Sequence, residues 1–163
     1  MRIAAESKIN LYLKVTAKRP DGYHELKTLF LPLAEPADEI TLEFAAGIFQ
    51  LECDDPALPP GGGNLAGRAA LLYAEESGIS PEWCVHIGKR IPVAAGMGGG
   101  SSDAAAVLRI LNRLYHRFSP EELARMALTL GADVPFFLDP RAGFATGVGD
   151  KLEPFDFPMP DLP

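Results

Sequence analysis

Residues 91–107 read IPVAAGMGGGSSDAAAV, and this stretch passes from an apolar segment through four glycines and two serines into alanines. Glycine has no Cβ, so backbone N–H groups in such a loop can approach an anion closely. A helix is predicted from about Ser102 to Tyr115, and the unpaired N–H groups of its first turn would face the same anion. The alternative is a flexible loop before a serine-capped helix. Because ordering so many glycines costs entropy, the stretch favours a phosphate-binding loop.

Two common phosphate-binding motifs do not fit this loop. A P-loop ends in Gly-Lys-Ser/Thr, and no lysine follows these glycines. A dinucleotide-binding loop has the spacing Gly-x-Gly-x-x-Gly after the first strand of a βαβ unit, whereas the spacing here is Gly96-x-Gly98-Gly99-Gly100. The loop is therefore predicted to be a phosphate site of another kind, and its glycines do not decide which phosphate compound it binds.

The whole chain has the size and composition of one globular domain, with 163 residues of which 47% are hydrophobic and 23% charged. The net charge of −7 disfavours a nucleic-acid or membrane surface as partner, because both are anionic. No apolar run reaches the roughly 20 residues that span a bilayer, and the N-terminus lacks the pattern of a secretory signal. Cys53 and Cys84 form neither a CxxC pair nor a zinc-binding spacing. They are expected to be two buried thiols in a reducing, cytoplasmic setting.

The first half of the chain is rich in strand signals. Alternating apolar and polar residues and β-branched or aromatic side chains predict strands at about residues 8–17, 26–33, 38–44 and 48–53. The segment PALPPGGGN is the strongest break. After it, Asn64 can cap a helix over residues 65–77 that Gly78 ends, and a strand follows over residues 83–93.

The second half contains the better punctuated helices. Ser119 is the predicted N-cap of a helix that ends at Gly131, with Pro120 at the first position and Glu122 completing a capping box. A short turn or helix in ADVPFFLD and a hairpin in GFATGVGD follow. Strands come first and helices later, which predicts an α+β fold with a mixed or antiparallel sheet packed against helices.

Four charged or titratable side chains are candidates for chemistry beside the loop. Asp133 lies just past a capped helix among apolar residues, so it is either a general base or the cap of the next turn. Lys8 precedes an apolar strand, where it is either solvated or aimed into a site. His24 can equally be a turn residue, and Lys89 an ordinary surface lysine at the end of its strand.

Three segments together resemble one protein family: SKINLYLKVTAKRPDGYHELKTLF (7–30), IPVAAGMGGGSSDAAAVLRILN (91–112) and MALTLGADVPFF (126–137). Over about residues 8–152 the chain is similar to the 4-diphosphocytidyl-2-C-methyl-D-erythritol kinases, a family of the GHMP kinase superfamily. The segment DGYHEL favours this family over homoserine, mevalonate or galactose kinases, whereas the whole superfamily shares the glycine loop. The resemblance implies the fold of a GHMP kinase N-terminal domain, which is like domain 2 of ribosomal protein S5.

The resemblance also implies an activity: transfer of the ATP γ-phosphate to the 2-hydroxyl of a cytidine diphosphate-linked methylerythritol. This step belongs to isoprenoid (terpenoid) precursor biosynthesis by the methylerythritol phosphate pathway, and its expected cofactors are ATP and Mg²⁺. Residues 1–154 would be the ATP- and substrate-binding domain, and residues 155–163 a proline-rich linker or truncated end. A C-terminal domain is expected in the full-length protein. The alternatives are a GHMP kinase for another small alcohol, or a nucleotide-binding fragment without turnover.

Residue roles follow from the resemblance. Asp133 would take the proton of the acceptor hydroxyl, and Lys8 would keep this carboxylate ionised and stabilise charge at the transferred group. Asn10 would contact the sugar alcohol. The remaining assignments form two sets, with no side chain assigned to a metal: for the cytosine, Tyr23, His24, Phe30 and Lys89; for ATP, Asn64 near the adenine and, in the loop, Pro92, Ala94, Ala95, Gly96, Met97, Gly98, Gly99, Gly100, Ser101 and Ser102.

Overall fold

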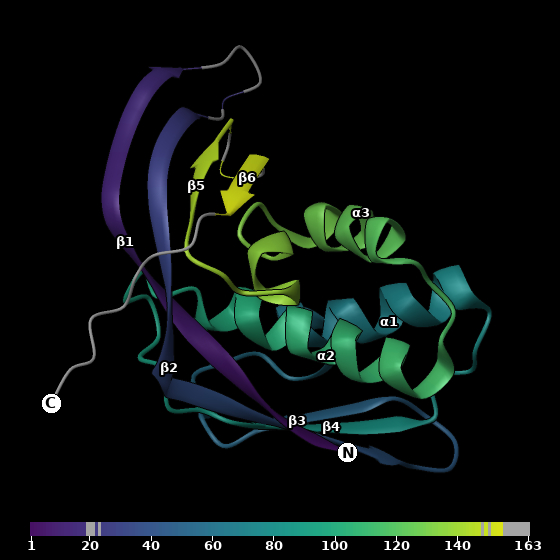
Figure 1. The fold of residues 1–163 in the computed structure, drawn as a ribbon. Helices are drawn as coiled ribbons and strands as arrows, with labels where there is room; N and C mark the ends of the chain where they lie inside the picture. Colours follow the sequence, from purple (N-terminus) through teal and green to yellow (C-terminus); the bar gives the residue numbers. More distant parts are fainter. Residues whose placement is uncertain (19–21, 23, 148, 150, 155–163) are drawn as a thin grey trace, which may run out of the picture.

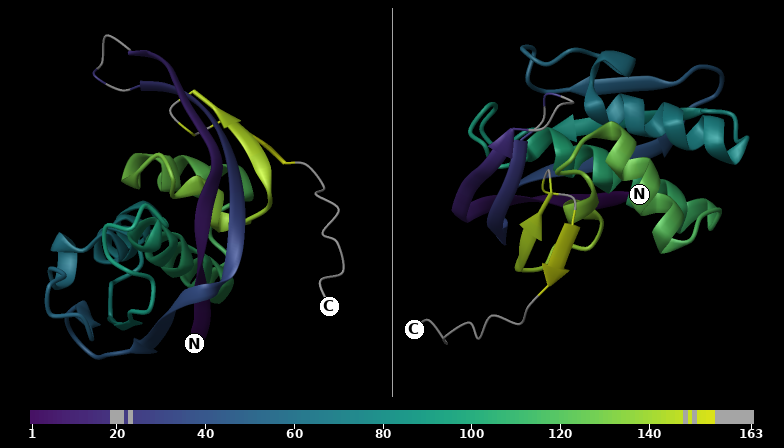
Figure 2. Two further views of the ribbon diagram at one scale, coloured as in Figure 1. Left: turned by 90° about the vertical axis from the view of Figure 1, so that its left-hand side faces the viewer. Right: turned by 90° about the horizontal axis from the view of Figure 1, so that it is seen from above.

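Two long antiparallel strands, β1 (Arg2–Lys18) and β2 (His24–Phe44), form the central pair of the sheet. The computed structural model describes residues 1–18, 22, 24–147, 149 and 151–154. The prediction of separate strands at 26–33 and 38–44 is wrong, because β2 runs through both. β1 pairs with both halves of β2, and residues 34–36 are accommodated opposite the junction Glu6/Ser7, where the register shifts. The two strands bend sharply along their length (Figure 2).

One half of β2 carries a βαβ unit. Residues 39–44 of β2 pair antiparallel with β4 (Trp83–Gly88), and β4 pairs parallel with the short strand β3 (Gln50–Cys53). Between β3 and β4 the chain forms a 3₁₀ turn, η1 (Gly61–Gly63), and then helix α1 (Leu65–Ser77). The predicted caps are confirmed: Asn64 Oδ1 accepts the N–H of Ala66 at 3.0 Å, and Gly78 has the left-handed backbone of a helix end.

The other half of β2 is extended by a small hairpin. β5 (Gly143–Thr146) pairs with residues 28–30 of β2, and β6 (Lys151–Pro154) pairs with β5. The hairpin predicted in GFATGVGD is therefore present. Because β4 and β5 pair with different halves of β2, the mixed sheet has two arms (Figure 1). The predicted linker at 155–163 lies outside the described residues.

Helices α2 (Gly99–Tyr115) and α3 (Pro120–Leu130) complete the helical layer on the concave side of the sheet (Figure 1). The capping box of α3 is confirmed, with Ser119 Oγ accepting the N–H of Glu122 and the Glu122 carboxylate accepting the N–H of Ser119. The predicted start of α2 at Ser102 is wrong by three residues. Gly98, with φ of +76°, is the N-cap, so Gly99 to Ser102 form the first turn and the free loop is shorter than predicted.

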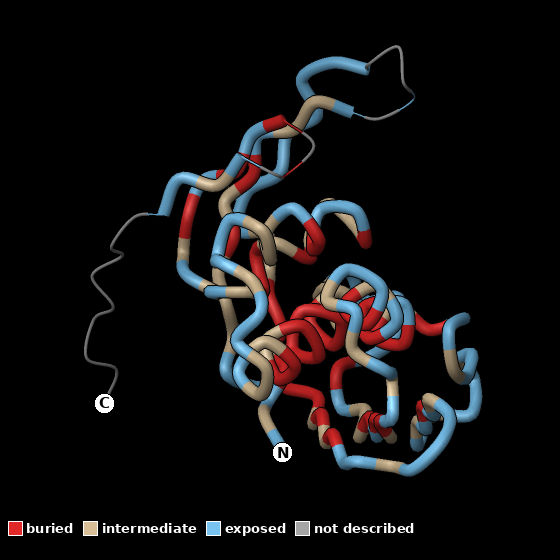
Figure 3. The backbone as a smooth tube through the Cα atoms, turned by 90° about the vertical axis from the view of Figure 1, so that its right-hand side faces the viewer, coloured by how far each residue is buried: buried red, intermediate tan, exposed pale blue. Residues whose placement is uncertain are grey.

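The hydrophobic core lies between the helices and the β2–β4 arm, where the buried segments gather (Figure 3). Its largest side chain is Trp83, which is fully buried and donates its indole N–H to Tyr115 Oη at 2.9 Å. Cys53 and Cys84 are free thiols. Both are half-buried, so the expectation that they would be fully buried is wrong. No described helix is both long and apolar enough to cross a membrane.

Candidate active site

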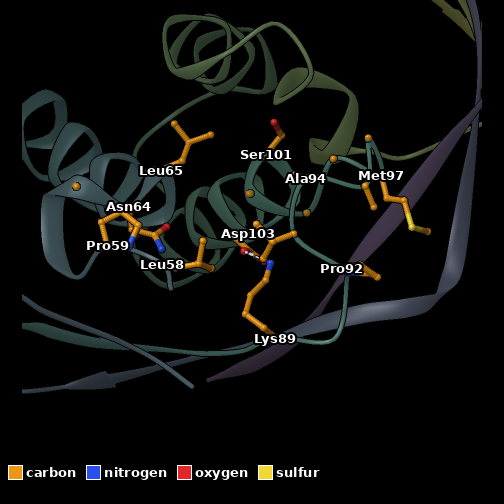
Figure 4. Close-up of a pocket in the computed structure, with 17 residues that line it drawn as sticks. Leu58, Pro59, Asn64, Leu65, Lys89, Pro92, Ala94, Met97, Ser101 and Asp103 are labelled. Carbon is orange, nitrogen blue, oxygen red and sulfur yellow. Dashed lines mark hydrogen bonds and ion pairs between the residues drawn. The ribbon is translucent and has the colours of Figure 1, made fainter. Parts of the chain in front are cut away.

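The glycine loop borders a cavity of about 420 Å³ between α1 and the N-terminal turn of α2 (Figure 4). Every loop residue predicted to hold ATP lines it except Ser102, and so does Asn64. Ser102 is buried in the first turn of α2, where its N–H donates to Gly98 O at 2.8 Å. Ala94 has φ of +61°, an uncommon conformation for a residue with a Cβ, and such strain concentrates at functional sites. The cavity is lined by Leu58, Pro59, Gly63, Asn64, Leu65, Lys89, Pro92, Val93, Ala94, Ala95, Gly96, Met97, Gly98, Gly99, Gly100, Ser101 and Asp103.

Several of these lining residues were not predicted from the sequence. Leu58, Pro59 and Gly63 lie within the predicted break PALPPGGGN (56–64), and Leu65 follows it directly. The length of that break was the sequence feature that could have pointed to them. Asp103 also lines the cavity and was not predicted. The available signal was a carboxylate placed directly before three alanines near the start of a predicted helix.

Lys8 and Asp133 come together beside this cavity. Lys8 Nζ lies 3.5 Å from Asp133 Oδ2, the Lys8 side chain is 6% exposed, and the Asp133 side chain is 37% exposed. Asp133 belongs to the turn between α3 and η2 (Pro135–Leu138), which is packed in place by Phe136 and Phe137. The pair thus joins a buried cation to a carboxylate that solvent or a ligand can still reach.

A short hydrogen-bond chain holds the Lys8 ammonium in place. Lys8 Nζ donates to Asn10 Oδ1 at 2.6 Å, and Asn10 Nδ2 donates to Thr28 Oγ1 at 2.7 Å. The Phe30 ring covers the ammonium, with Nζ 5.0 Å from the ring centroid. Asn10 and Phe30 are thus beside Lys8. Thr28, a polar residue in the middle of an apolar strand, is 1% exposed and was not predicted from the sequence.

The glycine loop touches the Lys8 pair directly. The N–H of Lys8 donates to Met97 O at 3.0 Å. A Cβ added at Gly98 would lie 3.3 Å from Lys8 Cε and 2.6 Å from Phe137 Cζ. The end of the loop is therefore in contact with both the lysine and the segment that positions Asp133.

We expect Gly98→Ala to destabilise the domain by about 1–3 kcal/mol. The new methyl group would overlap Phe137, and an alanine would be strained at φ of +76°. The measurement is urea unfolding. The control is Gly100→Ala in the first turn of α2, where a Cβ would meet no atom within 4 Å and alanine favours the helix. Equal stability of the two variants would contradict the assigned contact.

Lys89 lies in a different environment from the other residues predicted to hold the substrate. Its side chain is 8% exposed and its ammonium forms ion pairs with Asp38 and with Asp103, the latter at 3.0 Å. Asp103 Oδ1 is buried and has no hydrogen-bond partner among the described residues. Burial raises the pKa of Asp103 to about 7; Lys89 opposes this rise and Asp38 adds to it. Burial opposes the charge of Lys89, but the attraction of Asp103 and Asp38 outweighs it and raises the Lys89 pKa.

The raised pKa of Asp103 predicts a pH dependence of stability. Between its ordinary value of 3.8 and about 7, the native state keeps a proton that the unfolded chain releases. This group therefore lowers the free energy of unfolding as the pH rises through that window. In Asp103→Asn, urea unfolding at pH 5 to 8 should show a shallower decline, by about 2–3 kcal/mol over the range. Glu75→Gln, on the exposed face of α1, is the control, and equal slopes in Asp103→Asn and the parent would refute the expectation.

One of the predicted cytosine-binding residues, His24, lies near the end of the β1–β2 pair that is formed by Lys18 and His24. His24 is exposed at the start of β2, opposite Lys18, six residues along the strand from Phe30. Tyr23 lies outside the described residues. The structure therefore brings together Lys8, Asn10, Phe30 and Asp133, and it leaves His24 farther along the same arm.

The arrangement suits one kind of chemistry. Backbone N–H groups at the start of a 17-residue helix favour an anionic group in the cavity. At the end of the loop, a reachable carboxylate beside a buried cation can accept a proton from a hydroxyl and stabilise charge on a transferred group. The site therefore suits transfer of a phosphoryl group to an alcohol.

Comparison with known proteins gives concordant matches. A family model described as "GHMP kinases N terminal domain" matches residues 64–139. A 4-diphosphocytidyl-2-C-methyl-D-erythritol kinase of Solidesulfovibrio magneticus is 50% identical over 153 residues, which are 91% of this chain and 51% of that protein. The enzyme of the same name from Anaeromyxobacter dehalogenans is 44% identical over 97% of this chain and 51% of its own length. The chain spans about half the length of the curated relatives it matches.

Comparison with solved structures also finds similarity to a kinase of this name. A crystal structure of 4-(cytidine 5'-diphospho)-2C-methyl-D-erythritol kinase superposes with a TM-score of 0.81 at 46% identity, over 97% of this chain and 56% of that one. A crystal structure of mevalonate kinase superposes with a TM-score of 0.71 at 14% identity, covering 96% of this chain and 56% of the other, which shows a shared fold only.

Proposed function

This chain folds as a GHMP kinase N-terminal domain, and on that premise we propose that it supplies the catalytic pair and both binding surfaces of a kinase. The proposed reaction transfers the γ-phosphate of ATP to the 2-hydroxyl of 4-diphosphocytidyl-2-C-methyl-D-erythritol, a step of isoprenoid precursor biosynthesis. The observation that carries the proposal is the Lys8–Asp133 pair at 3.5 Å, in contact with the end of the glycine loop.

Asp133 is proposed as the general base. Its carboxylate takes the proton of the acceptor hydroxyl as that oxygen forms its bond to the γ-phosphorus and the bond to the ADP oxygen breaks. Lys8, held by Asn10 and covered by Phe30, offers its positive charge to the equatorial oxygens of the transferred group. Such transfers depend mostly on positioning and charge stabilisation, and these are the two tasks proposed for Asp133 and Lys8.

The glycine loop and Asn64 are proposed to hold ATP in the cavity of about 420 Å³, with the phosphates toward the first turn of α2. Mg²⁺ is proposed to arrive with the nucleotide and to neutralise phosphate charge. Among the described residues no cluster of three potential ligands could hold a metal ion alone. Mg²⁺ in nucleotide sites is commonly bound by phosphate oxygens and water together with one or two carboxylates.

The acceptor is proposed to lie along the inner face of the β1–β2 hairpin. Asn10, which accepts a hydrogen bond from Lys8, is proposed to contact the alcohol. Phe30 and His24 are proposed for the cytidine end, with Tyr23 next to His24 in sequence. Lys89 was also expected there. Its ammonium is instead paired with Asp38 and Asp103 on the cavity side of the loop, so we do not place it against the cytosine.

The deciding experiment is a substrate panel with γ-labelled ATP. Label transfer to the cytidine-containing alcohol, mevalonate and homoserine is measured for this chain and for the longest protein its gene encodes. Transfer to the cytidine compound alone is the expected result. Transfer only to another alcohol would replace the proposed acceptor, and ATP binding without transfer by either protein would make the domain a nucleotide-binding module.

A further inference from the structure

Three charged side chains from distant parts of the chain meet beneath the glycine loop: Asp38 of β2, Lys89 just after β4, and Asp103 of α2. We propose that this cluster is a positioning clamp that holds the loop in its nucleotide-binding shape. The inference rests on the proposed function in one respect only, that the molecule bound by the loop is a nucleotide.

The cluster contacts the chain at both ends of the loop. At the start, Asp38 Oδ1 accepts the N–H of Arg90 at 2.6 Å and that of Ile91 at 2.8 Å. At the far end, Asp103 lies in the second turn of α2, whose helix fixes the direction in which the loop leaves. The Lys89 ammonium joins the two carboxylates, so one buried cation ties the beginning of the loop to its end.

The segment between these two anchors has little support of its own. Residues 93–96 are not buried, and the exposed fraction of Val93 is 53%. Apart from the bond of Ser102 N–H to Gly98 O, which begins helix α2, residues 92–98 form two backbone hydrogen bonds with described residues: Ala95 N–H to Pro92 O at 3.4 Å and Lys8 N–H to Met97 O at 3.0 Å. Because so few bonds fix the loop internally, its shape depends on where its ends are held.

The cluster also places the positive charge of Lys89 close to the proposed phosphate position. A Cβ added at Gly99 would lie 3.2 Å from Lys89 Nζ, so the ammonium lies directly under the helix N-terminus. The described titratable groups facing Asp103 are Lys89, Asp38 and, at the end of β3, Cys53; Asp54 accepts the backbone N–H of Lys89 nearby. With Asp103 ionised the three-residue cluster carries a net charge of about −1, and with Asp103 protonated about zero. A bound phosphate therefore favours the protonated form.

The primary test is amide hydrogen exchange in residues 92–98 without nucleotide, together with ATP affinity and steady-state kinetics in the protein as encoded. In Lys89→Met we expect exchange in the loop to speed up and ATP to bind about tenfold more weakly, with kcat at saturating ATP nearly kept. Lys14→Met, an exposed lysine on the far arm of β1, is the matched control and should change neither quantity. Unchanged loop exchange, or a loss of kcat with ATP affinity intact, would overturn the clamp.

Asp103→Asn serves if Lys89→Met does not fold, since it keeps the shape and leaves the Asp38–Lys89 pair in place. Faster loop exchange is again expected, and exchange equal to that of the parent would refute the clamp. If the parent itself binds no ATP, the proposed function fails, while the clamp is still judged on loop exchange.

The pH dependence of ATP affinity tests whether the charge of the cluster acts on bound nucleotide or whether the cluster is purely structural. As the pH rises from 6 to 8, Asp103 loses its proton, and parent affinity for ATP should fall relative to that of Asp103→Asn by about fivefold. The titration of ATP itself cancels in this ratio, because both proteins meet the same nucleotide. A ratio that does not vary with pH would exclude any effect of the cluster on bound nucleotide.

Discussion

Asp133→Asn should lower kcat by about 10³-fold or more while leaving ATP affinity almost unchanged. Asparagine has the shape of aspartate but cannot take a proton from the acceptor hydroxyl, and general-base catalysis contributes about 10²–10⁴-fold. ATP affinity should survive because the cavity lining does not include Asp133. The fold should also survive, since the side chain is 37% exposed and its ion pair within the described residues is the one with Lys8.

The experiment pairs single-turnover rates with a separate measurement of ATP binding. The control is Asp139→Asn, a carboxylate at the other end of η2 that is 74% exposed and pairs with Arg141 at 3.0 Å. The control should have the parent rate. If Asp133→Asn reacts within a few-fold of the parent, Asp133 is not the base and the proposed mechanism is wrong.

Lys8→Met should produce a folded protein that is slower by about 10²–10³-fold, the usual loss when one pre-organised charge-stabilising group is removed. Methionine fills similar space, and removing a charge from a buried pair is tolerated when the partner can be solvated, as Asp133 can. Lys8→Arg should not restore the rate, because the larger planar guanidinium does not fit between Asn10, the Phe30 ring and Gly98.

The double variant tests whether the pair works as a unit. In Lys8→Met/Asp133→Asn the rate should be no lower than that of the slower single variant. If the two side chains act together on one step, removing either one already abolishes their joint contribution, so removing the second costs nothing more. Lys14→Met, on an exposed position of the same strand, controls for the loss of a lysine. A double variant whose loss is the product of the two single losses would show that Lys8 and Asp133 act independently.

Local features of the fold could be predicted well. The capping box at Ser119, the cap at Asn64 and the end at Gly78 were each anticipated and each found. These features depend on residues within four positions of one another, so the chain carries their full cause locally. The glycine loop was identified for the same reason, although the start of α2 was placed three residues late because glycines were expected to lie outside the helix.

The site was only partly predictable from the residues. Taken alone, the pattern around Lys8 fits a solvated lysine as well as a catalytic one, and Asp133 fits a helix cap. The family resemblance, not the periodicity, favoured their pairing. Nothing local indicated that Thr28 would support Asn10, or that Lys89 would lie between two buried carboxylates.

The sequence by itself therefore determined the approximate extent of the helices, the caps of α1 and α3 and the α+β class, and it predicts an anion-binding role for residues 91–107. Only the tertiary structure decided that residues 24–44 form one bent strand, that Lys8 meets Asp133, and that Asp38 and Asp103 share Lys89. The physical reason is the range of the interactions. Caps and turns form between neighbours, whereas these contacts depend on the register of β1 on β2 and on which charges that register buries together.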